Sequence, residues 1–201
     1  MDYSKFKTPH ISNAEIKNRA DLARGGLCDG KVPIDIENIL MTLKVNVIPL
    51  PNLRSQINFD SFITSNWENV YVDNDDYLDD FQYRRVRFSL AHELGHLILH
   101  RKLFESLNIR TLEEYYNFYE QVPGDQYGYL EAQANSFAGY FLVPREELFK
   151  YREEILKKFR KKLEDSGVKI KDEDLMEYLI NPLAEIFNVS GQAIRIALQN
   201  K

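Results

Sequence analysis

The chain has 201 residues, of which 44% are hydrophobic and 28% charged, and a formal net charge of -5 at pH 7. This composition is typical of a soluble globular protein, and the length suits one domain or a domain with a helical appendage. The acidic balance disfavours a protein that mainly binds nucleic acid. No apolar run approaches the roughly 20 residues of a membrane span, and the polar N-terminus lacks a signal-peptide core. With Cys28 as the only cysteine, we expect a cytoplasmic protein with no membrane partner.

The first part of the chain predicts two helices. Ser12 followed by Glu15 has the spacing of a capping box and predicts a helix over 12–23. Pro33, which suits the first turn of a helix, precedes apolar residues at helical spacing and predicts a second helix over 32–43.

Three short runs then have β patterns. The runs "KVNVIPLP", "FDSFIT" and "NVYVD" alternate in polarity or are rich in aromatic and β-branched residues. They predict three strands of one small antiparallel sheet.

The rest of the chain is predicted to be mainly helical. Apolar residues recur with helical spacing over 80–100, which predicts one long helix. The aromatic-rich segment 101–130 predicts one short helix and a loop, and "LEAQANSFAGYFLVP" predicts a helix that ends at Pro144. A Lys- and Glu-rich helix with a solvated charged face follows, then a helical pair around "NPLAEIFNVSGQAIRIAL". We therefore expect an α+β fold, with a core over 1–145 and a helical C-terminal extension over 146–201 packed on it.

Three of the four histidines lie in the stretch "RFSLAHELGHLILH" of the predicted long helix. Residues four apart project from one face of a helix, so His92 and His96 can reach one ion. With Glu93 they form the pattern H-E-x-x-H, in which two imidazoles bind zinc and the glutamate accepts a proton from the attacking water. The motif predicts the chemistry of a zinc metalloprotease.

A catalytic zinc site also needs a third protein ligand. We favour Glu131, at the start of the predicted small-residue helix, because that helix is able to pack closely against the first. Asn135, one turn further on, suits a hydrogen bond to the second ring nitrogen of a ligand histidine. Glu120 is the competing carboxylate. His100 lies too far along a regular helix from His92 to share one ion, so we expect a hydrogen-bonding or helix-terminal role for it.

The stretches "PIDIENILMTLKVNVIPL", "FSLAHELGHLILH" and "EAQANSFAGYFLVP" together resemble the ImmA/IrrE family of zinc metallopeptidases, over roughly residues 12–145. The resemblance implies that His92, His96 and Glu131 bind zinc and that Glu93 is the catalytic base. It also implies a gluzincin-like core, in which a small sheet lies beside two metal-bearing helices.

The family resemblance further implies a helix-turn-helix repressor as the protein substrate. The relatives' N-terminal helix-turn-helix domain has no counterpart here, so we expect the repressor to be a separate chain. The segment between His96 and Glu131 is long for the family, and we interpret it as an inserted lid.

These observations predict peptide hydrolysis, with the substrate added as a strand along "FDSFIT". The donor that stabilises the oxyanion stays open among Tyr127, Tyr129, Tyr140 and His100. One alternative is a non-proteolytic regulatory protein whose zinc site is structural or sensory. Another is a DNA-binding regulator that uses "LAEIFNVSGQAIRIAL", which resembles a helix-turn-helix but has few basic side chains, Arg195 chief among them.

Overall fold

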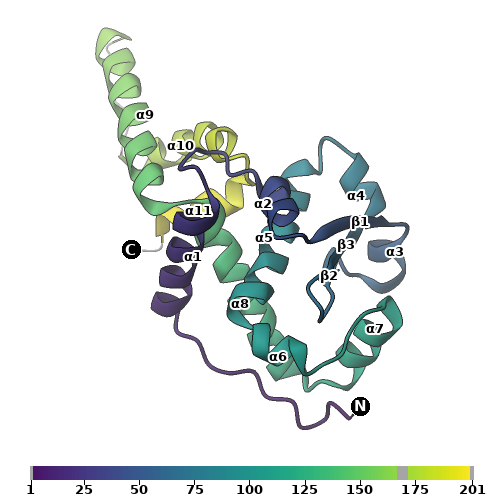
Figure 1. The fold of residues 1–201 in the computed structure, drawn as a ribbon. Coiled ribbons are helices and arrows are strands. Elements are labelled where there is room, and N and C mark those ends of the chain that lie inside the picture. Colours follow the sequence, from purple (N-terminus) through teal and green to yellow (C-terminus); the bar gives the residue numbers. More distant parts are fainter. Residues whose placement is uncertain (1, 167–171, 200–201) are drawn as a thin grey trace.

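The computed structural model describes residues 2–166 and 172–199, which are mostly helical with one small sheet (Figure 1). In chain order the elements are α1 (Asn13–Leu27), α2 (Ile36–Thr42), β1 (Asn46–Leu50), α3 (Leu53–Ile57), β2 (Ser61–Ile63), β3 (Asn69–Asp73), α4 (Asn74–Leu78), α5 (Tyr83–Leu99), α6 (Arg101–Glu105), α7 (Leu112–Gln121), α8 (Gly124–Leu142), α9 (Arg145–Ser166), α10 (Asp172–Phe187) and α11 (Gly191–Gln199). The predicted α+β class with a three-stranded sheet is confirmed.

The sheet has the order β1-β3-β2, with β3 in the centre. β2 pairs with β3 antiparallel, as predicted, but β1 runs parallel to β3 from Asn46 opposite Asn69 to Leu50 opposite Asp73. The sheet is therefore mixed, and the prediction of a purely antiparallel sheet was wrong for one pairing. Residues 51–68, with α3 and β2, form a connection long enough for a crossover between parallel neighbours. The polarity pattern of a strand does not encode the direction of its neighbour.

The two N-terminal helices begin at capping side chains. The Ser12 hydroxyl accepts a hydrogen bond from the backbone N–H of Glu15, which confirms the predicted start of α1. The start of α2 differs from the prediction: Pro33 precedes the helix, and the Asp35 carboxylate caps it by accepting from the N–H of Asn38. Aspartate is a strong N-cap residue because its oxygen satisfies a free N–H of the first turn.

Helices α5 and α8 lie side by side at the centre, with the sheet on one side and the C-terminal helices on the other (Figure 1). A Cβ atom at Gly95 would lie 3.2 Å from the backbone oxygen of Ala134, so glycine permits this close approach. Ala134 and Ala138 are fully buried, which confirms that small residues of α8 pack closely, whereas Ala132 is exposed. α8 begins at Gly124, and Glu131 therefore lies about two turns inside the helix rather than at its start.

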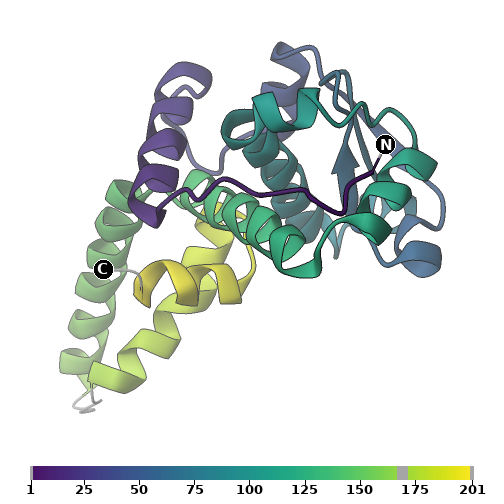
Figure 2. The ribbon, with the colours of Figure 1, turned by 90° about the horizontal axis from the view of Figure 1, so that it is seen from below.

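The segment between α5 and α8 is more helical than predicted. It contains α6 and α7 rather than one short helix, and α7 starts at a complete capping box formed by Thr111 and Glu114. The extended N-terminal residues run from α1 along α8 towards α7 (Figure 2). The N-terminal segment thus packs on the helix that carries Glu131.

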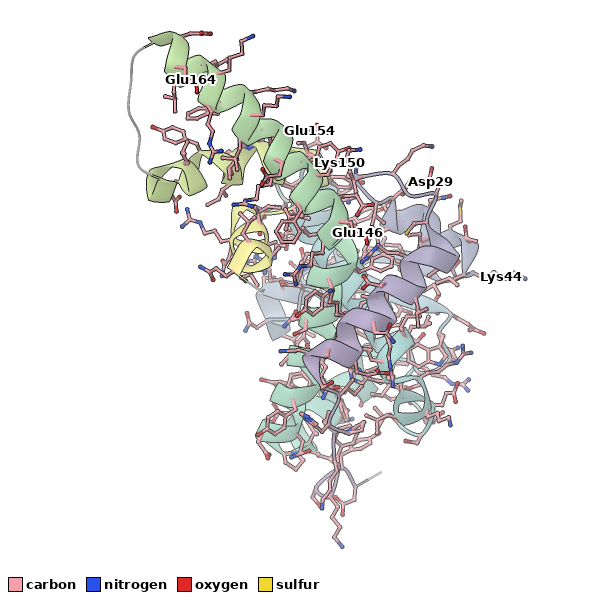
Figure 3. All side chains as sticks on the ribbon, turned by 90° about the vertical axis from the view of Figure 1, so that its left-hand side faces the viewer. Asp29, Lys44, Glu146, Lys150, Glu154 and Glu164 are labelled. Carbon is pink, nitrogen blue, oxygen red and sulfur yellow. The ribbon has the colours of Figure 1, made fainter. Side chains whose placement is uncertain are left out.

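Helices α9 and α10 project from the body, and α11 returns towards α8 (Figure 1). Glu146, Lys150, Glu154 and Glu164 extend from α9 (Figure 3), and the charged residues of its middle turns are mostly exposed, which confirms the predicted solvated face. The helical pair around the Asn-Val-Ser turn is present as α10 and α11. In the described part of the chain, no helix combines the length and apolarity needed to cross a bilayer.

Candidate metal centre

The centre is built from α5 and α8. His92 and His96 project from one face of α5, and Glu131 faces them from α8. One ligand atom from each of these three residues lies within 4.8 Å of the other two. The two Nε2 atoms are 3.0 Å apart, and Glu131 oxygens lie 3.1 Å from His92 Nε2 and 3.5 Å from His96 Nε2.

These spacings fit a tetrahedral zinc ion. Ligand atoms at about 2.0–2.2 Å from such an ion lie about 3.3 Å from one another. The distances among the three residues, from 3.0 to 3.5 Å, are close to that value. Two imidazoles and one carboxylate also form a donor set that leaves a fourth position open, as catalytic zinc sites require. His92, His96 and Glu131 are thus positioned as possible metal ligands.

Asn135 orients the first of these histidines. Its side-chain oxygen lies 2.9 Å from His92 Nδ1, and an amide oxygen only accepts, so Nδ1–H of His92 is the donor. The other ring nitrogen, Nε2, is therefore the atom that faces the centre. The hydrogen bond predicted for Asn135 is confirmed, and such contacts hold ligand histidines in place in metal sites.

His100 is not one of the three clustered residues. It follows the last residue of α5, is 1% exposed, and its Nδ1 lies 3.0 Å from His96 Nδ1. The predicted hydrogen-bonding and helix-terminal role is confirmed. Burial lowers the pKa of the His100 imidazole to about 3, and the ring is therefore neutral at neutral pH.

Opposite charges in the centre stabilise each other. Burial by itself would lower the pKa of His92, but the Glu131 carboxylate outweighs it and raises that pKa to about 9. Burial likewise opposes ionisation of Glu131, yet the two histidines hold the pKa of its carboxyl well below the usual range. Without a metal ion, His92 and Glu131 therefore form an ion pair at neutral pH.

Glu93 lies beside this pair on α5. Its side chain is 2% exposed, and burial raises the pKa of its carboxyl. Ser61, on the edge strand β2, donates a hydrogen bond to Glu93 Oε1 at 2.6 Å. A buried carboxylate with a raised pKa and a fixed orientation suits proton transfer. The sequence predicted β2 but contained no signal that singled out Ser61.

Among the three tyrosines considered as oxyanion donors, Tyr127 is the one that shares a face of α8 with Glu131, because it lies one turn before it. The fourth candidate, His100, is bonded to His96 instead. The Tyr127 hydroxyl is 3.0 Å from that of Tyr115 on α7. Burial raises the pKa of both hydroxyls, and the neighbouring Glu131 and Glu93 carboxylates raise them further. Tyr115 was missed by the sequence analysis, since nothing in its spacing distinguishes it from the other tyrosines.

The remaining sequence candidates lie elsewhere. Tyr129 is 60% exposed, and Tyr140 lies nine residues beyond Glu131 on α8, roughly 13 Å along the helix axis. Glu120 is exposed on α7 and does not belong to the ligand cluster. Glu131 is thus the carboxylate that the structure brings to the two histidines.

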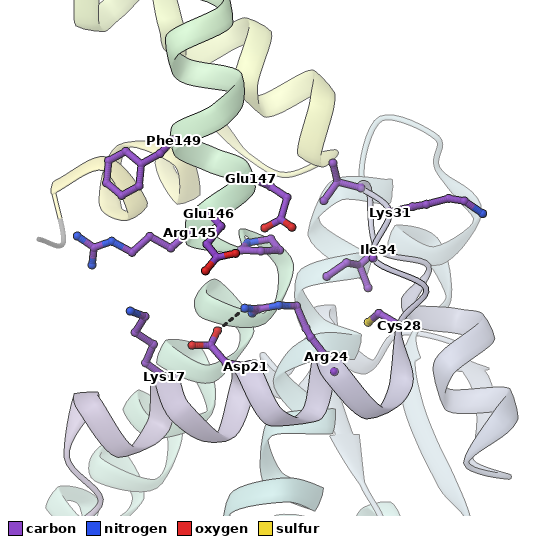
Figure 4. Close-up of a pocket in the computed structure, with 14 residues that line it drawn as sticks. Lys17, Asp21, Arg24, Cys28, Lys31, Ile34, Arg145, Glu146, Glu147 and Phe149 are labelled. Carbon is purple, nitrogen blue, oxygen red and sulfur yellow. Dashed lines mark hydrogen bonds and ion pairs between the residues drawn. The ribbon is translucent and has the colours of Figure 1, made fainter.

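A cavity of about 630 Å³ lies between α1 and the start of α9 (Figure 4). Its lining mixes cations and anions, and Arg24 forms an ion pair with Asp21 there. None of the candidate ligands lines it. Cys28 does, and burial raises the pKa of its thiol, which lowers the fraction of reactive thiolate.

The helix-borne H-E-x-x-H pattern and the carboxylate from a second helix form a possible three-ligand metal site. A family model for the IrrE N-terminal-like domain, Peptidase_M78, matches residues 79–199, which include both helices of the centre. The chain belongs to this family.

A solved structure described as a Mycobacterium tuberculosis transcriptional regulator is similar in fold, with a TM-score of 0.50 and 17% sequence identity. The similarity covers 90% of this chain but 45% of the regulator, so the chain spans about half the length of that protein. A comparison with curated proteins gave no match.

Proposed function

We propose that the protein is a zinc-dependent endopeptidase that uses His92, His96 and Glu131 as metal ligands and Glu93 as catalytic base. The observation that carries this proposal is the convergence of the three possible ligands beside a buried, oriented glutamate. Membership of a peptidase family supports it.

In the proposed mechanism, Glu93 accepts the proton of the attacking water and then donates it to the leaving amine. Its raised pKa favours both steps, because the carboxyl is able to hold the proton between them. A zinc ion held by His92, His96 and Glu131 would polarise the scissile carbonyl and increase the acidity of the water. The Ser61 hydroxyl keeps one Glu93 oxygen fixed and leaves the other for the reaction.

The substrate is proposed to bind along β2. This strand pairs with β3 on one side, and in the described part of the chain no strand pairs with its other side. An extended peptide added there would form backbone hydrogen bonds and pass close to Glu93, which Ser61 of the same strand contacts. We assign the oxyanion donor to Tyr127, whose hydroxyl Tyr115 orients.

The aromatic segment before α8 forms a wall of this site rather than a detached lid. Tyr115 stacks on Phe62 of β2, with ring centroids 4.9 Å apart, and meets Phe59 edge to face at 5.1 Å. Such packing fixes the position of α7 beside the edge strand. A walled site favours one dedicated protein substrate over general digestion.

The proposed substrate is a helix-turn-helix repressor encoded as a separate chain, and the proposed location is the cytoplasm. Both follow from the family resemblance and the composition. We also keep the division into a core over 1–145 and a C-terminal helical extension over 146–201 as a proposal. Direct DNA binding through α11 is disfavoured, because the chain is acidic and this helix has few basic side chains, chiefly Arg195, which pairs with Glu177 at 2.7 Å.

The substrate is identified by comparing cellular peptides in strains with wild-type protein and with Glu93→Gln. Fragments of a repressor that accumulate only with the wild type support the proposal. An unchanged peptide profile, with zinc bound to both proteins, favours the alternative of a non-proteolytic regulatory protein with a structural or sensory zinc site.

A further inference from the structure

We propose that His100 and Gln133 are positioning residues that fix the ring tautomer of His96 and link the metal centre to the N-terminal segment. Neither residue belongs to the ligand cluster, and neither forms a hydrogen bond with Glu93. The inference rests on the proposed metal site, because it concerns how one of the proposed ligands is prepared to bind.

The orientation of the Gln133 amide follows from its two hydrogen-bond partners. One end of this amide lies 2.9 Å from the backbone oxygen of Pro9, and a carbonyl only accepts hydrogen bonds. That end is therefore the NH2 group. The amide oxygen then faces His100 Nε2 at 3.1 Å and accepts a hydrogen bond from it.

The tautomer of His100 determines the tautomer of His96. The His100 ring is 1% exposed and faces two uncharged partners, the Gln133 amide oxygen and His96 Nδ1, so a ring with one N–H satisfies both contacts. Since Gln133 assigns that hydrogen to Nε2, the Nδ1 atom of His100 is an acceptor. His96 Nδ1, 3.0 Å away, must then carry the hydrogen. His96 Nε2 is left with a free lone pair, directed at His92 and Glu131.

The series of hydrogen bonds ends at the backbone oxygen of Pro9. Pro9 belongs to the extended N-terminal segment that runs along α8 (Figure 2). Thr8 fastens the segment to Gln126 of α8 through two hydrogen bonds, at 2.9 and 2.6 Å, and Tyr3 donates to the backbone oxygen of Leu107 at 2.9 Å. Both contacts lie on the N-terminal side of Pro9, and Thr8 is its immediate neighbour, so they hold the carbonyl that orients Gln133.

The link matters because the other tautomer of His96 does not bind zinc through Nε2. With a hydrogen on Nε2, that atom would present a proton to the centre where a lone pair is needed. Residues that orient ligand histidines typically change metal affinity about 10- to 100-fold when they are replaced. We expect His100 and Gln133 to fall in this range, although both lie outside the ligand set.

The test compares two substitutions of His100. In His100→Asn, the side-chain oxygen takes about the position of Nδ1 and accepts from His96, whereas His100→Leu fills the space without an acceptor. Zinc affinity is measured by competition with a chelator. We expect it to fall roughly 10- to 100-fold for His100→Leu and to stay within a few-fold of wild type for His100→Asn. Equal affinity of wild type and His100→Leu would overturn the inference.

A second measurement does not depend on zinc. Nitrogen NMR of the metal-free protein reports which ring nitrogen of His96 carries the hydrogen, with exposed His10 as an internal reference. We expect the hydrogen on Nδ1 in wild type, and a mixture of tautomers in Gln133→Met, which removes the acceptor for His100. Hydrogen on Nε2 in the wild type would overturn the inference even if His100→Leu does not fold. Wild type that binds no zinc but has Nδ1–H would instead contradict the proposed function alone.

Discussion

The hydroxyl of Ser61 donates to Glu93 Oε1 at 2.6 Å, and this bond joins the edge strand of the sheet to the helix that carries the proposed catalytic base. A peptide bound along that strand is therefore held in a fixed relation to the group that transfers its protons. In the proposed mechanism, this one short contact would connect substrate binding with catalysis.

Removal of this contact is expected to slow hydrolysis and to shift its pH dependence. The Ser61 bond lowers the pKa of Glu93, opposing the effect of burial, so Ser61→Ala should raise that pKa further. Glu93 then stays protonated up to a higher pH, so the acid limb of the kcat/KM profile shifts to higher pH. We expect the rate at neutral pH to fall about 10-fold or more, since a hydrogen bond to a charged group contributes about 1.5–3 kcal/mol. An unshifted acid limb would show that Ser61 does not act on the base.

The hydroxyl of Tyr127 is expected to act only in the transition state. Tyr127→Phe keeps the ring and its edge-to-face contact with Tyr119, but removes the proposed oxyanion donor. We expect kcat to fall on the order of 100-fold with little change in KM. Tyr129→Phe, at an exposed position of the same helix, is the matched control and should leave kcat unchanged. A similar loss in both variants would contradict the assignment.

The identity of the third ligand is tested by comparing two carboxylates. Glu131 lies 3.1 and 3.5 Å from the two histidine nitrogens, whereas Glu120 is exposed on α7. Zinc affinity is measured by chelator competition. It should fall on the order of 100-fold or more in Glu131→Ala, because one metal ligand is lost. It should stay at the wild-type value in Glu120→Ala. The opposite ranking would transfer the ligand role to Glu120.

Zinc binding should release a proton from His92. The pKa of this residue is about 9 in the metal-free protein, so the ring is protonated at pH 7, and Nε2 must lose its hydrogen before it binds an ion. The apparent affinity should therefore rise with pH and level off above about 9. Calorimetry at pH 7 in buffers of different ionisation enthalpy should detect about one released proton per zinc. Binding without proton release would mean that Glu131 does not raise the pKa of His92.

The possible metal ligands were predictable in part, because residues four apart share a face of a helix. His92 and His96 share a face of one helix, and Glu131 shares a face of another with Asn135. The sequence contained no equivalent rule for contacts between distant segments. The bond from Ser61 to Glu93, the pairing of Tyr115 with Tyr127 and the parallel direction of β1 all depend on tertiary packing.

Metal-dependent hydrolysis is tested most directly by Glu93→Gln, which keeps the shape of the side chain but removes the base. Purified wild type and variant should each hold about one zinc ion per chain. With a helix-turn-helix repressor as substrate and casein as a control, the wild type should cleave the repressor and leave casein almost intact. The variant should cleave the repressor at least about 100-fold more slowly than the wild type. Equal cleavage by both proteins, with zinc bound in both, would contradict the assignment of Glu93 as the catalytic base.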